Sequence, residues 1–288
     1  MLKQIVIISG KGGTGKTTIA AAFAALSEHK VMVDCDVDAA DLHLLLKPII
    51  KHREVFKAGF SFFIEKNKCI QCGKCKELCR FDAISKDFVI DPISCEGCSF
   101  CKWICPTSAI DTKERIRGEW FLSTTRFGPL IHAKLNIAEQ NSGKLVTLVR
   151  NKAKQLAEQK GYSWIIIDGA PGIGCPVIAS LSGVDYALVI TEPTLSGLHD
   201  ADRVIKVAKH FNVYSNVVIN KYDLNLNITR KIEKYCEKNN IELIGKVSFD
   251  KSVVNAMVKS KTIIEYRNSV AKEEINNIWN RLKKMSVN

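Results

Sequence analysis

The chain has 288 residues, of which 46% are hydrophobic and 25% are charged, so it can bury one large core and a second, smaller one. No segment has the length of apolar sequence that spans a bilayer, and the amino terminus shows no signal peptide, which excludes an integral membrane protein and favours a cytoplasmic one. The formal net charge is +12, from 42 basic and 30 acidic residues. No clustered basic stripe with interleaved aromatic residues accompanies this charge, so we expect a solvated surface rather than nucleic-acid binding.

The first expected element is a strand from Ile5 to Ile8, a short β-branched run typical of a buried parallel strand. A glycine-rich loop of the form G-x4-G-K-[ST] follows it, and the alanine-rich segment from Ile19 to Leu26 is expected to be helical. In this context backbone N-H groups and Lys16 bind phosphate, and the Thr17 hydroxyl ligates magnesium. The predicted nucleotide-binding residues are Gly10, Lys11, Gly12, Gly13, Thr14, Gly15, Lys16, Thr17 and Thr18.

The additional lysine, Lys11, makes the loop more specific. The form K-G-G-x-G-K-[ST] resembles the deviant Walker A motif of the MinD, ParA and nitrogenase iron protein superfamily. The resemblance implies a homodimer in which Lys11 reaches the partner's nucleotide; the alternative is a hydrated loop lysine. By the same resemblance Asp36, which follows the predicted strand from Val31 to Val33, would orient the attacking water, and Asp34 would support magnesium. Lys11, Lys16 and Asp36 are therefore the expected catalytic residues, because phosphoryl transfer depends chiefly on alignment and charge stabilisation.

Eight of the 11 cysteines form two identical C-x2-C-x2-C-x3-C runs that are 26 residues apart. This spacing suits a cubane 4Fe-4S cluster, and in proteins with two such runs the fourth cysteine of each run ligates the other cluster. One predicted cluster is therefore held by Cys69, Cys72, Cys75 and Cys105, and the other by Cys95, Cys98, Cys101 and Cys79.

Zinc sites and disulfides are the alternatives for these cysteines. Zinc sites generally pair two C-x2-C knuckles across a longer gap, and metal-ligand spacing without a signal peptide argues for reduced thiols. The repeat continues in Ala83-Ile84 and Ala109-Ile110, and the segment resembles a bacterial two-cluster ferredoxin. Arg80 follows the first run where Pro106 follows the second, so we expect the two cluster environments and their potentials to differ.

A third predicted strand, from Trp164 to Ile167, leads into Asp168, which resembles a Walker B aspartate that holds magnesium through water. Gly169 and Gly172 supply the backbone freedom of a nucleotide-sensing switch. Cys175 lies seven residues after Asp168, the interval at which the nitrogenase iron protein carries a cluster ligand. Both a buried core cysteine and a metal ligand at a dimer interface remain open for Cys175.

The predicted strand from Val217 to Ile219 ends in the sequence Asn220-Lys221-Tyr222-Asp223. The N-K-x-D form resembles the guanine reader of GTPases, whereas the corresponding asparagine of MinD-like proteins contacts adenine. An aspartate that reads guanine would be left unpaired by adenine, and an unpaired buried acceptor is costly. We expect ATP, with GTP as the alternative, and we expect Asn220 and Asp223 to contact the base.

The predicted fold is an α/β P-loop NTPase with a mainly parallel sheet flanked by helices, plus an inserted ferredoxin-like domain. Further strands are expected at 164–168, 186–191, 215–220 and 241–247, and the loops after Asp34, Asp168, Glu192 and Asn220 should share one edge of the sheet. The nucleotide-binding domain would comprise residues 1–60 and 116–288, and the insert residues 61–115.

The carboxyl-terminal segment from Ser269 to Asn288 shows apolar residues at helical spacing and is expected to dock on the sheet rather than to bind a membrane. No role is assigned to the segment from Glu139 to Lys144 or to His199. Two isolated cysteines, Cys35 and Cys236, also have no assigned role.

These patterns favour a cytosolic, homodimeric ATPase with Mg²⁺ that couples nucleotide-driven conformational change to electron transfer through two 4Fe-4S clusters. Its partner would be an unknown redox protein. The first alternative is an ATPase that carries or assembles metalloclusters for an accepting protein. The second is a positioning or partition switch in which the clusters sense redox state.

Overall fold

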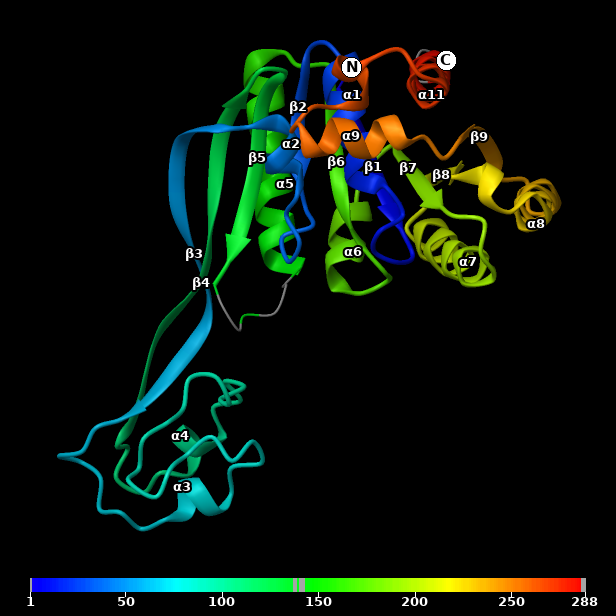
Figure 1. Ribbon diagram of the computed structural model, residues 1–288. Helices are drawn as coiled ribbons and strands as arrows, with labels where there is room; N and C mark the ends of the chain where they lie inside the picture. The colour runs from blue at the N-terminus through cyan, green and yellow to red at the C-terminus, as the bar shows by residue number, and fades with distance from the viewer. Residues whose placement is uncertain (1, 137–138, 140–142, 286–288) are drawn as a thin grey trace. The chain divides into compact units, whose positions relative to one another are not determined.

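The computed structural model describes residues 2–136, 139 and 143–285. The chain divides into two compact units (Figure 1). The sheet unit comprises residues 1–54, 120–135 and 140–288, and the insert unit comprises Val55–Glu119 and Asn136–Glu139. The insert unit is larger than the predicted insert of residues 61–115, because it also takes residues 55–60 and 116–119 of two long strands and a separate short segment.

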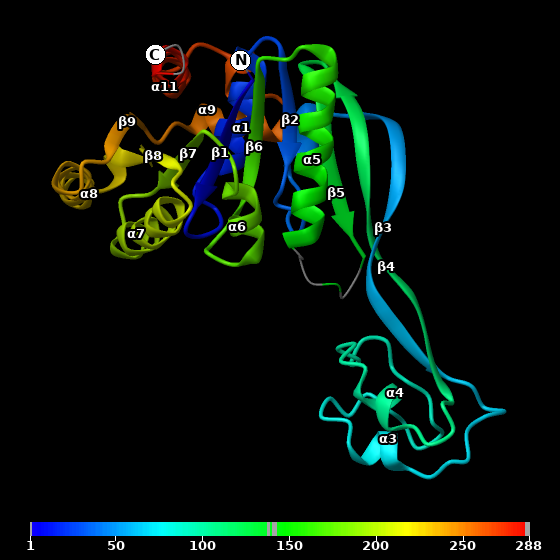
Figure 2. The same ribbon diagram turned by 180° about the vertical axis from the view of Figure 1, so that it is seen from behind.

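In the described part of the chain, nine strands form one sheet. They are β1 (Lys3–Ser9), β2 (Lys30–Asp34), β3 (Ile49–Ile64), β4 (Ile110–Thr125), β5 (Gly128–Leu135), β6 (Trp164–Pro171), β7 (Tyr186–Thr191), β8 (Tyr214–Asn220) and β9 (Glu242–Val247). Their order is β3-β4-β5-β2-β6-β1-β7-β8-β9. Every neighbouring pair from β5 to β9 is parallel, as predicted, and Figure 2 shows this series from behind.

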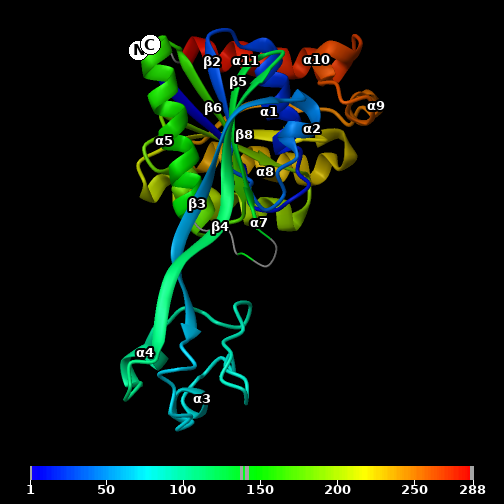
Figure 3. The ribbon, with the colours of Figure 1, turned by 90° about the vertical axis from the view of Figure 1, so that its left-hand side faces the viewer.

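Helices cover both faces of the parallel strands. The α-helices are α1 (Lys16–Leu26), α2 (Leu42–Leu46), α3 (Lys74–Glu77), α4 (Phe100–Ile104), α5 (Gly143–Lys160), α6 (Cys175–Leu181), α7 (Leu195–His210), α8 (Leu226–Lys238), α9 (Lys251–Val258), α10 (Ile263–Tyr266) and α11 (Val270–Met285), and η1 (Tyr222–Leu224) is a 3-10 turn. Figure 3 shows α5 on one side of the sheet and α1 and α2 on the other. None of the described helices has the length and hydrophobicity needed to cross a bilayer.

The central strand β1 is buried on both faces, because all four residues from Ile5 to Ile8 are fully enclosed. This continuous apolar pattern is what a parallel strand between two helical layers requires. On one face Ile5 and Ile7 belong to the same core cluster as Phe23 and the small alanines of α1. The alanine side chains allow α1 to lie close to the sheet, which fixes the loop that joins β1 to α1.

The carboxyl-terminal helix α11 docks on the sheet unit, as predicted. Trp279 is 2% exposed, and its ring lies 4.9 Å from that of Phe23 and 5.3 Å from that of Trp164, measured between centroids. Gly245 of β9 permits the close approach of α11, since a Cβ atom there would lie 2.4 Å from Cγ1 of Ile278. Helix α11 is therefore part of the hydrophobic core.

The insert unit has only a small hydrophobic core. Its buried cluster consists of Phe62, Ile84, Ile90 and Ile110. Five of the repeated cysteines pack against this cluster, namely Cys75, Cys79, Cys95, Cys101 and Cys105. A domain of this size with so little apolar core generally needs an additional source of stability, such as bound metal.

The cysteine repeat is reproduced in the backbone of the insert unit. Three pairs of positions that are 26 residues apart adopt a positive φ in both copies. A positive φ is unfavourable for most residues other than glycine, and such conformations concentrate at ligand-binding sites. The pairs are Gln71 and Gly97 (53° and 74°), Gly73 and Ser99 (80° and 65°), and Asp82 and Ser108 (46° and 50°).

The packing of α11 predicts that Trp279→Ala lowers the free energy of unfolding of the full chain by about 3–5 kcal/mol, because it removes a buried aromatic side chain. Urea denaturation followed by circular dichroism measures the change. The control is Lys283→Ala on the exposed side of the same helix, which should stay within about 0.5 kcal/mol of wild type. A loss below about 1 kcal/mol for Trp279→Ala would contradict the docking of α11 as a core element.

Candidate functional site

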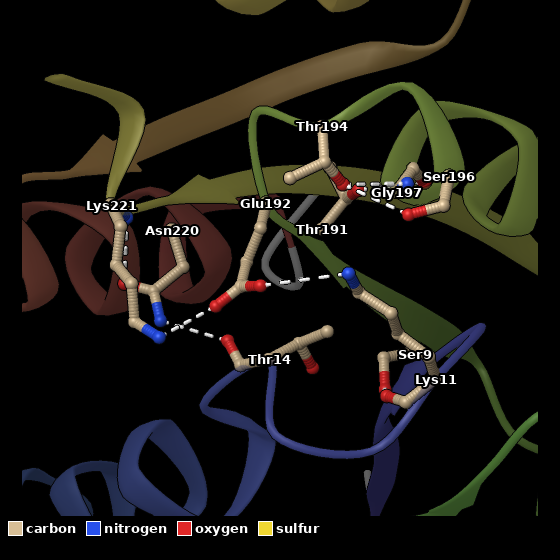
Figure 4. Close-up of polar contacts among 10 residues, drawn as sticks. All are labelled: Ser9, Lys11, Thr14, Thr191, Glu192, Thr194, Ser196, Gly197, Asn220 and Lys221. Carbon is tan, nitrogen blue, oxygen red and sulfur yellow. Dashed lines mark hydrogen bonds and ion pairs between the residues drawn. The ribbon is translucent and has the colours of Figure 1, made fainter. Parts of the chain in front are cut away.

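The glycine-rich loop joins β1 to α1 at the carboxyl edge of the parallel strands. Gly15 precedes α1 with a φ of 94°, and a Cβ atom there would lie 2.3 Å from Nδ2 of Asn220. The same amide nitrogen donates a hydrogen bond of 2.8 Å to the carbonyl oxygen of Thr14 (Figure 4). Asn220 therefore braces the loop, and glycine is the only residue that fits opposite it.

The loop borders a cavity of about 360 Å³. Of the predicted site residues, those that line it are Gly12, Gly13, Gly15, Lys16, Thr17, Thr18, Asp36 and Asn220. Gly10, Lys11, Thr14, Asp34, Asp168 and Asp223 are not among its lining residues. A cavity bounded by backbone N-H groups, a helix amino terminus and a buried lysine suits phosphate groups.

Two buried carboxylates lie beside this cavity. Asp34 and Asp168 are register partners on the neighbouring parallel strands β2 and β6, and each is 1% exposed. Within the described residues, both carboxylate oxygens of Asp168 and Oδ2 of Asp34 have no hydrogen-bond partner. Oδ1 of Asp34 accepts a bond of 3.1 Å from the backbone N-H of Asp36.

Burial and mutual repulsion make these carboxylates hard to ionise. Burial is the main cause that raises the pKa of Asp168 to about 7, and the nearby Thr17 hydroxyl and Lys16 ammonium oppose this only in part. The pKa of Asp34 is also raised, first by burial and then by the charge of Asp168. Buried oxygens without partners suit a hard cation, and Mg²⁺ generally takes one or two carboxylates together with phosphate and water. Thr17, Asp34 and Asp168 thus fit a magnesium ion.

Asp36 faces the phosphate cavity. Burial raises the pKa of Asp36, and the charge of Lys16 opposes the shift. A carboxylate in this position can accept a hydrogen bond from a water molecule in the cavity, as the sequence interpretation expects of Asp36.

On the base side, the aspartate of the N-K-x-D sequence is turned away from the cavity. Oδ1 of Asp223 accepts a 2.7 Å hydrogen bond from the backbone N-H of Phe249. The segment Ser248 to Asp250 lines the cavity, together with Val254 and Met257. Asp223 therefore holds the segment that borders the cavity and does not itself line it.

The sequence interpretation placed a further acidic residue, Glu192, at this edge of the sheet but gave it no role. It follows β7, and its carboxylate lies 2.6 Å from Nζ of Lys221 and 3.8 Å from Nζ of Lys11 (Figure 4). The sequence placed Glu192 directly after a strand at the functional edge, which is the one signal that could have identified it.

In the insert unit the repeated cysteines surround two cavities. One cavity is lined by the four cysteines Cys69, Cys72, Cys75 and Cys105. The other, of about 490 Å³, is lined by Cys79, Cys95, Cys98 and Cys101, and also by Cys75. These are the two groups that the cross-ligation pattern assigns, with Pro106 beside the first cavity and Arg80 beside the second.

Among the described residues, no three His, Cys, Asp or Glu side chains form a site for a single metal ion. A cubane cluster poses a different requirement, because each thiolate binds a separate iron and the four sulfur atoms must surround a volume. The four cysteines of each predicted set line one cavity, of about 20 Å³ for the first set and about 490 Å³ for the second. The backbone N-H of Ala109 also donates to Sγ of Cys105 at 3.3 Å, the kind of hydrogen bond that supports a ligating sulfur.

The three remaining cysteines lie in the sheet unit. Cys35 and Cys236 are buried, and burial raises the pKa of both thiols, that of Cys236 to about 11. Cys175 is exposed at the start of α6, next to Gly143 and Lys144. The core interpretation of Cys175 is therefore wrong, because its side chain reaches the surface.

The two other unassigned features are ordinary contacts. The carboxylate of Glu139 forms ion pairs with Arg115 at 2.6 Å and with Arg117 at 3.0 Å, and all three residues belong to the insert unit. His199 is exposed and lies 3.6 Å from Asp200. Residues 140–142, which belong to the same predicted segment as Glu139, lie outside the described residues.

The raised pKa of Asp168 predicts a pH-dependent stability of the metal-free protein. Because the folded state holds the proton of Asp168 more tightly than the unfolded chain does, the free energy of unfolding falls as the pH rises from about 4 to about 7 and levels off above that. We expect Asp168→Asn to reduce the loss of unfolding free energy between about pH 5 and about pH 8. The reduction should be on the order of 1.4 kcal/mol per unit of pKa shift. Thermal denaturation in EDTA measures it, with the exposed Glu237→Gln as control. If Asp168→Asn loses as much stability as wild type over this pH range, the raised pKa of Asp168 is refuted.

Comparisons with known proteins identify the fold and the family. The model of the CobQ/CobB/MinD/ParA nucleotide binding domain matches residues 5–263. An uncharacterized protein of Methanocaldococcus jannaschii is 37% identical over 98% of this chain and 97% of its own length. The septum site-determining protein MinD of Bacillus subtilis is 26% identical over 93% of this chain and 87% of its own length.

Solved structures share the architecture. The cell division ATPase MinD of Pyrococcus furiosus matches 99% of this chain and 100% of its own, with a TM-score of 0.63 and 17% identity. MinD of Pyrococcus horikoshii, solved in complex with Mg-ADP, matches 99% of this chain and 98% of its own, with a TM-score of 0.63 and 16% identity. With a family model that spans most of the sequence, this chain belongs to the CobQ/CobB/MinD/ParA family of nucleotide-binding proteins.

Proposed function

We propose that this protein is an ATP-hydrolysing iron-sulfur protein in which a nucleotide-controlled dimer governs electron transfer through two 4Fe-4S clusters. The observation that carries the proposal is the grouping of the eight repeated cysteines around two cavities, four assigned cysteines to each. The clusters would supply one-electron transfer. The proposal rests on the family for nucleotide binding and on the insert unit for redox chemistry.

The nucleotide half of the proposal rests on named contacts. Lys16 and the amino terminus of α1 would bind the phosphates, Thr17, Asp34 and Asp168 would hold Mg²⁺, and Asp36 would position water. We propose adenine as the base, because the Asp223 carboxylate is already bonded to the backbone of Phe249. A guanine reader needs that carboxylate free for the base.

The cluster half rests on the weakness of the insert core without a ligand. Cys72 and Cys98 are exposed, and the other six repeated cysteines are partly buried, so these thiols are accessible during assembly. Ala83 and Ala109, which follow the two cysteine runs at equivalent places in the repeat, are nearly fully buried. The small core and the paired positive-φ positions are both explained if the unit folds around two clusters.

The base assignment predicts that the wild-type protein prefers ATP to GTP and that Asp223→Ala weakens ATP binding roughly 3- to 30-fold, because the Ser248 to Asp250 segment loses its anchor. Asp223→Asn, which keeps an oxygen acceptor for Phe249, should bind ATP nearly as wild type does. Isothermal titration with both nucleotides measures this. GTP preference in wild type, abolished by Asp223→Asn, would instead assign Asp223 to the base.

The cluster assignment predicts about eight iron and eight sulfide per chain after anaerobic purification, and about half of each in Cys105→Ser. The lost cluster is the one that Cys69, Cys72 and Cys75 share with Cys105, so the residual electron paramagnetic resonance signal should be that of the Arg80 side. The exposed Cys175→Ser is the matched control and should keep all eight irons. Zinc in place of iron would contradict the assignment.

The same preparation separates electron transfer from cluster delivery. Cluster reduction and loss to an apo-acceptor are followed with and without Mg-ATP. Electron delivery that depends on Mg-ATP, with clusters retained, supports the proposal. If a further cluster is lost to the acceptor only when Cys175 is present, and eight irons per chain are retained, the carrier or assembly alternative is supported. If ATP affects neither cluster reduction nor cluster loss, both functions are refuted.

A further inference from the structure

The position of Glu192 leaves one carboxylate between two ammonium groups. Oε1 lies 2.6 Å from Nζ of Lys221, and Oε2 lies 3.8 Å from Nζ of Lys11 (Figure 4). The Glu192 side chain is only 17% exposed, whereas the two lysine side chains are 35% and 34% exposed. The acid is therefore held inside, and the two cations lie at the surface where another molecule can reach them.

The backbone around this cluster is fixed on all sides. The Ser9 hydroxyl donates to the carbonyl oxygen of Lys11 at 2.6 Å. The Thr194 hydroxyl caps α7 by accepting from the N-H of Gly197 at 2.9 Å. Since β1, β7 and β8 are consecutive in the sheet, the residues that follow them are necessarily neighbours. The carboxylate thus has a defined position between two braced loops.

Lys11 and Lys16 have different surroundings although both belong to the glycine-rich loop. Lys16 is 5% exposed and lines the phosphate cavity. Lys11 is not among the lining residues, and its ammonium group pairs with Glu192 instead. In this arrangement the Lys11 ammonium group is paired with Glu192 outside the phosphate cavity, and an anion from outside would compete with Glu192 for it.

We propose that Glu192 is a positioning residue that holds Lys11 in place on its own subunit until the triphosphate bound to a second copy of this chain competes for it. The inference rests on the nucleotide-dependent dimer of the proposed function. Glu192 lies closer to Lys221 than to Lys11. Lys11 is therefore the lysine that can be released more readily. A triphosphate carries more negative charge than a diphosphate, and both carry more than one carboxylate, so ATP competes with Glu192 for Lys11 more strongly than ADP does.

The arrangement predicts that substitutions of Glu192 and of Lys221 change the dimer Kd in opposite directions. Glu192→Gln removes the competing charge and should lower the Kd of the ATP-bound dimer roughly 3- to 5-fold, the range of a partly exposed ion pair. Lys221→Met leaves Glu192 with Lys11 alone and should raise that Kd by a similar factor. Sedimentation equilibrium of the full chain with saturating Mg²⁺ and a non-hydrolysable ATP analogue measures both.

Two controls separate this role from a structural one. Glu114→Gln removes an ion pair with Lys57, at 2.8 Å in the insert unit, and should leave the Kd unchanged. In a Lys11→Ala background, Glu192→Gln should have no effect on dimerisation, because no lysine remains to be released. The ADP affinity of each monomer is measured alongside and should be the same in Glu192→Gln and wild type.

A higher or unchanged Kd in Glu192→Gln, or an equal decrease in the Lys11→Ala background, would overturn the role of Glu192. A lower Kd in Lys221→Met would overturn it as well, even if Glu192→Gln failed to fold. If the wild-type chain stays monomeric with the ATP analogue, the proposed dimer itself is refuted. A dimer that forms in wild type but ignores Glu192 refutes only this inference.

Discussion

Two buried carboxylates, Asp34 and Asp168, lie in register at the carboxyl ends of neighbouring strands, and in the described part of the chain three of their four oxygens have no hydrogen-bond partner. Both are buried, so desolvation opposes their ionisation, and the charge of Asp168 further opposes that of Asp34. A bound cation relieves both effects at once. The sheet positions them within reach of Lys16 and Thr17, so the cation and the phosphates stabilise the same site. Ligands that bind only the folded chain stabilise it in proportion to their saturation.

In the insert unit, the proposed clusters would apply the same principle with softer ligands. Its hydrophobic cluster of Phe62, Ile84, Ile90 and Ile110 is too small to account for a stable fold of its own, and eight thiols surround the two cavities beside it. The paired positive-φ positions, such as Gly73 and Ser99, carry conformational strain that a bound group would offset. In both units, groups that are unfavourable in the isolated chain become favourable when a charged ligand is added.

The features that the sequence predicted well are local ones. The strand from Ile5 to Ile8, the glycine-rich loop and the helix after it depend on residues that are close in sequence, and so does the spacing of the cysteines. The bond from Phe249 to Asp223 and the contact of Glu192 with Lys11 depend on which strands are neighbours. The sequence contains no direct record of that order, so Asp223 was expected at the base and Glu192 had no role.

The cysteines illustrate how environment decides what a shared residue type can do. Cys35 is fully enclosed beside Arg150 and Asp34, and burial raises its pKa, so the thiolate that metal binding needs is disfavoured there. The eight repeated cysteines keep some exposure and share two cavities, where a cluster would stabilise the thiolates. Spacing alone separated these two classes, because the repeat places each thiol on a loop or on a helix of four or five residues that does not bury it fully. An isolated cysteine such as Cys175 carries no such signal, and its exposure had to come from the fold.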